Sequence, residues 1–140
     1  MGFTIDVDEQ QRRVTVVLRE VVTLDVLCGY VDELVQRGYW QWPTVIDTSA
    51  ALGLDLDSNG PTSFATHVAA YPARGPVVMV AITRGAKAIG ASLIAASRAA
   101  FPGHSEHRRI VDSMEAAHAW LDSQPQAPEP REEMLGFSEP

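Results

Sequence analysis

Hydrophobic and polar residues alternate at the start of the chain, where Phe3, Ile5 and Val7 are separated by polar side chains. This alternation predicts a half-buried strand. Residues 14–18 are apolar nearly throughout and predict a second strand. Because only a short polar turn separates the two segments, we expect an antiparallel hairpin.

Longer segments with helical spacing alternate with short apolar runs in the rest of the chain. The pattern predicts helices at residues 24–37, 61–71 and 86–100, and further strands at 44–47, 77–82 and 108–111. A capping box at residues 112–115 is predicted to open a fourth helix that runs through Leu121. Residues 77–82 are apolar on both faces, which is typical of a central strand covered by helices on both sides. Trp120 is predicted to anchor the last helix, and residues 48–59 are predicted to form a loop.

The element order is therefore β-β-α-β-α-β-α-β-α. Alternating strands and helices indicate an α/β fold with a mostly parallel central sheet of about five strands, an antiparallel edge strand and four helices. We expect one domain over residues 1–123. Residues 124–140 are rich in proline and glutamate and predict an acidic tail without a core of its own, whose deletion should cost little stability.

Composition and charge narrow the classes of function. The formal net charge of the 140 residues is -7, which disfavours binding to nucleic acid or to an anionic membrane surface. No apolar stretch approaches the ~20 residues of a membrane span, and the N-terminus lacks the pattern of a signal peptide. Cys28 is the single cysteine, so an internal disulfide is excluded and a cytoplasmic location is expected.

Three segments resemble the STAS (anti-sigma-factor-antagonist) fold, and more closely its SpoIIAA-like group. They are Val21-Val22-Thr23-Leu24-Asp25 before the first helix, Val45-Ile46-Asp47-Thr48-Ser49 around the third strand, and Ala116-Ala117-His118-Ala119-Trp120-Leu121 in the last helix. The resemblance covers about residues 3–122. It implies a non-catalytic regulatory or protein-interaction module that binds a protein partner, with a homodimer as a further option.

The same resemblance implies a phosphorylation switch in some members, at a serine in an Asp-Ser-Ser-Gly turn. Asp57-Ser58-Asn59-Gly60 matches this turn except at Asn59 and lies two residues too far from Asp47. Ser58 is therefore the phosphorylation candidate. The alternative is that Ser58 is a plain helix cap.

The loops after the third and fourth strands are expected to lie side by side at the carboxyl edge of the sheet, where open α/β sheets bind ligands. An alternative function is accordingly the binding of a small anionic or lipid-like ligand. The candidate ligand or partner residues are Asp47, Ser49, Asp57, Thr62, Thr83, Arg84 and Lys87. The competing interpretation is that these residues are caps and turn formers.

Other chemistry finds little support in the sequence. No nucleophile elbow, P-loop or glycine-rich dinucleotide turn occurs, so we expect neither an enzyme nor a cofactor. His104 and His107 lie close together, but a zinc site needs three or four ligands, so no metal is expected. Trp40 and Trp42 form an aromatic-rich loop that is either a lid over the end of the sheet or a contact surface.

Overall fold

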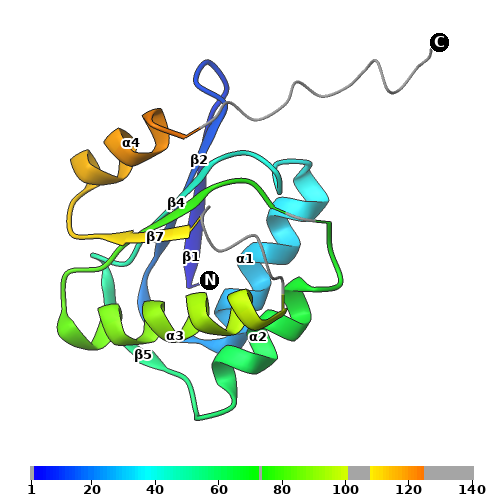
Figure 1. Ribbon diagram of the computed structural model, residues 1–140, viewed down its shortest axis with the longest axis vertical. Helices are drawn as coiled ribbons and strands as arrows, with labels where there is room; N and C mark the ends of the chain where they lie inside the picture. Colours follow the sequence, from blue (N-terminus) through cyan, green and yellow to red (C-terminus); the bar gives the residue numbers. More distant parts are fainter. Residues whose placement is uncertain (1, 73, 101–107, 125–140) are drawn as a thin grey trace.

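The computed structural model describes residues 2–72, 74–100 and 108–124, and it shows an α/β fold (Figure 1). The strands are β1 (Phe3–Asp8), β2 (Arg13–Leu18), β3 (Glu20–Thr23), β4 (Thr44–Asp47), β5 (Ala51–Asp55), β6 (Val77–Val80) and β7 (Arg108–Val111). The helices are α1 (Leu24–Arg37), α2 (Gly60–Val68), α3 (Arg84–Ala100) and α4 (Met114–Asp122). The alternation of these strands with the four helices confirms the predicted α/β class.

Five strands form the main sheet of the described residues, in the order β1-β2-β4-β6-β7. β1 pairs antiparallel with β2, and the remaining neighbours pair in parallel. The predicted hairpin and the predicted antiparallel edge strand are both confirmed. Strands that follow a helix run parallel to their neighbours because each helix returns the chain to the same edge of the sheet.

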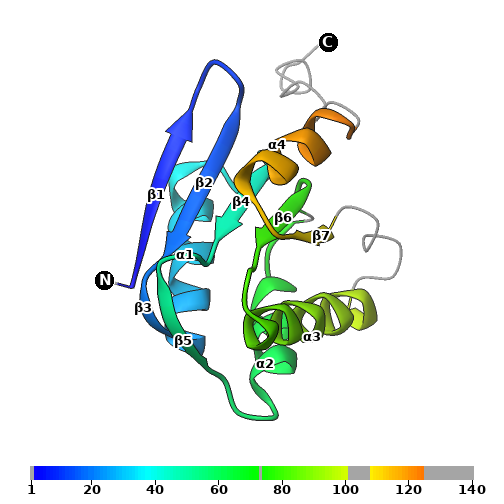
Figure 2. The same cartoon turned by 90° about the vertical axis from the view of Figure 1, so that its left-hand side faces the viewer.

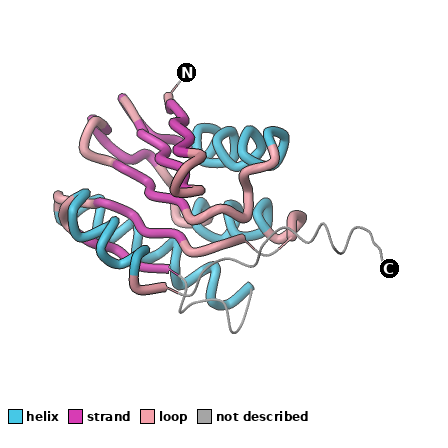
Figure 3. Tube along the Cα trace, turned by 90° about the horizontal axis from the view of Figure 1, so that it is seen from above, coloured by secondary structure: helices cyan, strands magenta, loops and turns pink. Residues whose placement is uncertain are grey.

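Helices cover both faces of this sheet, as Figures 2 and 3 show. Ile46 and Val77 belong to a buried cluster with side chains of α1, α2 and α3, whereas Val45 and Val78 belong to a second cluster with Ala117 of α4. Successive residues of a strand point to opposite faces, so strands that are apolar at every position suit this two-sided burial. The doubly covered central strand is thus confirmed.

The ends of α1 follow from local sequence signals. The Thr23 side chain accepts a hydrogen bond from the Val26 backbone N–H at 3.3 Å, which caps the first turn. Gly38 ends the helix with a φ of 84°, and its N–H donates to carbonyls of the last turn. A side chain at position 38 would be strained in this left-handed conformation, so glycine is the residue expected there.

Two strands were not predicted from the sequence. β3 pairs in parallel with β5 to form a separate two-stranded sheet, with Val21 opposite Gly53. The prediction of a loop over residues 48–59 is therefore wrong for the residues of β5. The sequence pattern for β3 and β5 is weak because both strands are short and β5 contains a glycine. A register shift also interrupts their pairing after Glu20.

The last helix packs across the opposite face of the sheet. Ser113 caps α4 by accepting a hydrogen bond from the Ala116 N–H at 3.0 Å. Leu121 is buried, whereas Trp120 is half-buried and packs against the same cluster. Arg13 of β2 contacts both His118 and Asp122 and ties the helix to the hairpin. The predicted acidic tail lies, apart from Gln124, outside the described residues.

No helix in the described ranges is both long and apolar enough to span a membrane.

Candidate functional site

The carboxyl edge of the sheet holds a recess between the loops that follow β4 and β6, as the sequence predicted for these loops. It has a volume of about 360 Å³. The lining comes from the β4–β5 loop, β5, the loop after β6 and the first turns of α3, and includes Thr48, Ser49, Leu52, Ile82 and Thr83. Two candidate residues, Ser49 and Thr83, therefore meet here.

The polar groups of this recess already have partners within the protein. Ser49 donates from its hydroxyl and its backbone N–H to Asp47 Oδ1, at 2.7 and 2.9 Å. Thr48 Oγ1 donates to the Val80 carbonyl at 2.7 Å. Thr83 Oγ1 accepts from the Ala86 N–H at 3.1 Å and caps α3, which begins two residues earlier than predicted. These contacts are those of turn formers and caps.

The other candidate residues do not line the recess. Asp57 accepts from the Asn59 N–H in the turn before α2, and Thr62 is an exposed residue of that helix. Ser58 is exposed, and its hydroxyl makes no hydrogen bond with any described residue. Asn59 occupies the cap position of α2 without a side-chain cap hydrogen bond. Ser58 is thus not the helix cap that the alternative interpretation required.

Arg84 and Lys87 both lie on the exposed side of the first turns of α3. Lys87 lines a shallow depression with Arg109 and Asp112 near the end of β7. The recess therefore has no cationic side chain in its lining. An anion at the carboxyl edge would have only backbone N–H groups at the start of α3.

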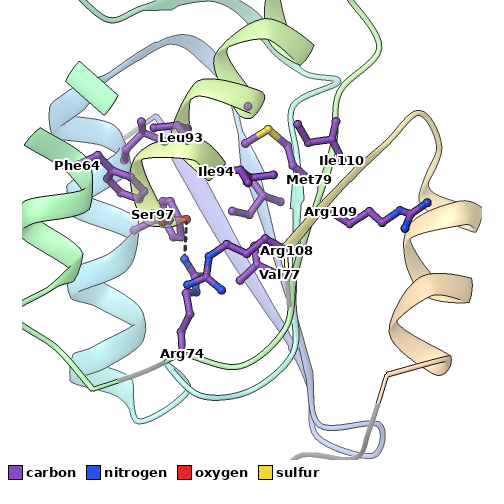
Figure 4. A pocket seen from close by; sticks show the side chains of 14 residues that line it. Phe64, Arg74, Val77, Met79, Leu93, Ile94, Ser97, Arg108, Arg109 and Ile110 are labelled. Atoms are coloured by element: carbon purple, nitrogen blue, oxygen red, sulfur yellow. Dashed lines mark hydrogen bonds between the residues drawn. The ribbon is translucent and has the colours of Figure 1, made fainter. Parts of the chain in front are cut away.

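A second cavity lies between the sheet and helices α1, α2 and α3. It has a volume of about 50 Å³. Its walls are almost entirely apolar and include Phe64, Met79, Leu93 and Ile110. Gly90 of α3 also lines it, and a β-carbon at this position would lie only 2.9 Å from Met79 and from Ile110. Figure 4 shows two arginine side chains, Arg74 and Arg108, reaching the same end of this cavity.

Arg74 comes from the loop before β6 and is held by aromatic side chains. Its guanidinium carbon lies 4.2 Å from the ring centroid of Trp40 and 6.0 Å from that of Tyr30. Nη1 makes a long hydrogen bond of 3.4 Å to the Tyr30 hydroxyl. Nε and Nη2 are buried and have no hydrogen-bond partner, and no ion pair among the described residues involves Arg74.

Arg108 is the first residue of β7 and pairs in register with Val77. Its side chain points to the same face of the sheet as Ile110, two residues later. The pKa of Arg108 is lowered to about 10, first because the guanidinium is buried and second because the positive charge of Arg74 lies nearby. Two cations therefore share one buried location.

Sequence reasoning missed both arginines. For Arg108 a signal existed: in the strand Arg108–Val111, Ile110 has to face the core, and the period of two then places Arg108 on the core side. Arg74 follows a helix end in a short connecting loop, and no periodicity indicates where its side chain points. The end of the cavity that holds Arg74 and Arg108 also lies near the amino ends of β6 and β7. This edge of the sheet is opposite to the one expected for ligands.

The aromatic-rich loop that contains Trp40 and Trp42 packs against the Arg74 side chain through Trp40. Trp40 is only 4% exposed, and its indole N–H donates to the Pro72 carbonyl at 2.7 Å. Trp42 is half-buried and packs edge-on against Tyr39, with ring centroids 4.8 Å apart. Trp40 therefore contacts the candidate site from within the core and is not part of an exposed contact surface.

A polar cluster joins α1 to α2 on the surface. Asp32 Oδ1 accepts a hydrogen bond from the Tyr71 hydroxyl at 2.7 Å and lies 2.8 Å from His67 Nε2. These contacts lower the pKa of Asp32, with the Tyr71 hydroxyl as the main cause, and the same bond raises the pKa of Tyr71. Burial raises the pKa of the Cys28 thiol, and Asp32 adds to this effect. A thiol shifted in this direction is a poor nucleophile.

Within the described ranges, no group of three or more histidine, cysteine, aspartate or glutamate side chains could hold a metal ion. The pair His104 and His107 lies outside the described residues.

No protein-family model matches the chain, and comparisons with curated proteins and with solved structures give no significant match.

Proposed function

We propose that the protein is a non-catalytic, STAS-like module that binds a small anion in the cavity between the sheet and helices α1–α3. The observation that carries the proposal is the pair of partly buried guanidinium groups of Arg74 and Arg108 at one end of a mostly apolar cavity, with Nε and Nη2 of Arg74 buried and unpaired. The STAS-like part of the proposal is supported by the four helices and by the mixed sheet with its single antiparallel pair.

The physical argument starts from the cost of burying charge. A buried cation without an acceptor loses its hydration and gains nothing in return, and a second cation beside it adds repulsion. Nε and Nη2 of Arg74 are in this position. A bound anion would give these two nitrogens an acceptor and would offset the repulsion between the two guanidinium groups, so the site favours an anionic ligand. The apolar walls favour a ligand with an apolar part.

The carboxyl-edge recess is the weaker ligand site although it is larger. It lacks a cationic side chain, and its hydroxyl groups are engaged in turns and caps. Volume alone carries no specificity, whereas a few well-placed polar groups in an apolar site do.

The proposal is tested by thermal unfolding of the wild type and of Arg74→Met in the presence of short-chain carboxylates and inorganic phosphate. A ligand at about 100 times its Kd should add about 2.7 kcal/mol to the stability of the wild type. Arg74→Met should abolish this gain. Methionine is apolar and similar in length, so the variant without ligand should be as stable as the wild type or more stable.

A matched control is Arg98→Met, which removes an exposed arginine from α3. This variant should respond to ligand as the wild type does. The proposal is contradicted if no anion stabilises the wild type. It is also contradicted if Arg74→Met lowers the free energy of unfolding by several kcal/mol, because Arg74 would then be a structural residue.

A second candidate function is a regulatory interaction module in which two copies of the chain associate through the carboxyl edge. Leu52 is 82% exposed and Ile82 is 60% exposed, and both border the recess at this edge. A projecting apolar side chain beside a recess that is lined in part by apolar side chains can be self-complementary, as a two-fold interface requires. Ser58 lies shortly after β5, so its phosphorylation would place negative charge near this surface.

Sedimentation equilibrium of the wild type and of Leu52→Asp tests the second candidate. We expect a dimer for the wild type and a monomer for the variant. A wild type that stays monomeric at high concentration contradicts it.

A further inference from the structure

We infer that the ligand is a short-chain organic monocarboxylate, held side-on by the Nε–Nη2 edge of Arg74 with its hydrocarbon part in the apolar cavity. This inference rests on the proposed function and names the ligand class of the same site.

The two unpartnered nitrogen atoms of Arg74 identify the acceptor. Nε and Nη2 lie on one edge of the planar guanidinium group, and their N–H bonds point in parallel. This edge matches the two oxygens of a carboxylate in a bidentate pair. Both atoms of this edge are buried without a partner, whereas Nη1 on the other side already bonds to Tyr30. The nitrogens that the protein leaves unpaired are thus the two whose geometry suits a carboxylate.

The environment of Arg74 keeps this edge in place. The ring of Trp40 lies 4.2 Å from the guanidinium carbon, and the Trp40 N–H is itself bonded to the Pro72 carbonyl. A guanidinium group packed on an aromatic ring and bonded at Nη1 has few alternative orientations. The donor edge is therefore preorganised, which reduces the entropy lost when an anion binds.

The cavity determines the rest of the ligand. Its volume of about 50 Å³ is several times the ~10–15 Å³ that a cavity needs to hold one water molecule, so it suits a hydrocarbon group of a few carbons. Met79, Leu93, Ile94 and Ile110 supply apolar walls. These four side chains offer no hydrogen bond to the additional oxygens of a phosphate or to a second carboxylate at the far end of the ligand. A monocarboxylate fits better than a phosphate or a dicarboxylate for this reason.

Calorimetric titration of the full chain with acetate, propionate, butyrate, butyramide and inorganic phosphate tests the inference. Affinity should rise about fourfold for each added CH2 group, the factor that corresponds to burying one methylene. The rise should stop once the chain is longer than the cavity. Butyramide has almost the same shape as butyrate but no charge, so it should not bind measurably.

Arg74→Lys separates the donor edge from the charge. Lysine keeps the positive charge but cannot form the bidentate pair, so butyrate affinity should fall at least tenfold. Arg98→Lys makes the same chemical change on the exposed side of α3 and should leave the affinity unchanged. The thermal midpoint of each variant shows that it is folded.

The outcomes distinguish this inference from the proposed function. Tighter binding of inorganic phosphate than of butyrate, lost in Arg74→Met, overturns the inference and leaves the proposed function standing. Equal butyrate affinity in Arg74→Lys and wild type overturns the side-on geometry. Equal binding of butyrate and butyramide by the wild type overturns the carboxylate, and this comparison needs no variant. If no anion in the series binds, both proposals fail.

Discussion

The guanidinium group of Arg74 packs against the indole of Trp40, with 4.2 Å between the guanidinium carbon and the ring centroid. The two residues come from different loops, one before β4 and one before β6. Trp40 also donates a hydrogen bond to the Pro72 carbonyl, in the same loop as Arg74. One buried tryptophan therefore fixes the loop that carries the candidate ligand-binding arginine.

Replacement of Trp40 by leucine should lower the free energy of unfolding by about 3–5 kcal/mol, the range for truncation of a large buried aromatic. The change empties part of the core and leaves the Pro72 carbonyl without its donor. Trp42→Leu is the control, because Trp42 is only half-buried and should cost clearly less. Urea unfolding followed by far-ultraviolet circular dichroism measures both. Equal losses would show that Trp40 has no special role in the core.

Gly75→Ala should destabilise the fold by about 1–3 kcal/mol, as overpacking of a tight site does. A β-carbon at position 75 would lie 2.3 Å from the Gln41 carbonyl oxygen, and a backbone atom cannot move aside as a flexible side chain can. Gly53→Ala provides the comparison, because a β-carbon there meets nothing within 4 Å. Thermal melts of both variants should differ clearly. A Gly75→Ala protein as stable as Gly53→Ala would mean that the two loops are not in close contact.

The Asp32 cluster predicts a pH-dependent contribution to stability. The pKa of Asp32 is lowered in the folded protein, chiefly by the Tyr71 hydroxyl and then by His67, so folding favours the ionised carboxyl. The contribution is present above the ordinary pKa of aspartate, and it is lost as the pH falls through the lowered value. Because the cluster is half-exposed, we expect it to be worth less than about 1 kcal/mol.

Thermal midpoints of the wild type and of Asp32→Asn measure this contribution. The variant should melt lower at pH 7, and the difference should shrink as the pH falls below about 4. Asp55→Asn removes an exposed aspartate at the end of β5 and should show no comparable trend. A difference that stays constant with pH would assign the effect to something other than the ionised carboxyl.

Ser58→Ala should change stability by no more than about 0.5 kcal/mol, the range for an exposed side chain without specific contacts. This expectation is lower than for a helix cap, because Asn59 and not Ser58 occupies the cap position of α2. If the carboxyl edge is a regulatory interface, Ser58→Asp should weaken self-association while leaving the thermal midpoint nearly unchanged. Unaltered association in sedimentation equilibrium would argue against a switch at this serine.

The main sheet and the helices could be predicted because their signals are local. Alternation at Phe3, Ile5 and Val7, the Thr23 cap and the Gly38 stop each depend on a few neighbouring residues, and the structure confirms them. β3 and β5 could not be predicted in the same way. Each is stabilised by pairing with the other, about 30 residues away in the chain, and contact of this kind leaves no period in either segment.

The site that we propose lies at the edge opposite to the one that the sequence predicted, for a related reason. Ser49 and Thr83 do meet at the carboxyl edge, as parallel strands require. The buried cations arise where a loop residue, Arg74, meets an inward-facing strand residue, Arg108. Only the strand alternation at Arg108 could have been read from the sequence, and the burial of Arg74 depends on its packing against Trp40.

The location of the ligand site is the central claim, and a titration of 15N-labelled protein with butyrate tests it most directly. Two-dimensional 1H–15N spectra report the environment of each backbone amide and of the arginine Nε–H groups. We predict that the largest shifts occur at the Arg74 Nε–H and at the amides of Val77, Gly90 and Ile110, which surround the cavity. Shifts centred instead on Ser49, Gly53 and Gly85 would place the ligand at the carboxyl edge and contradict the account.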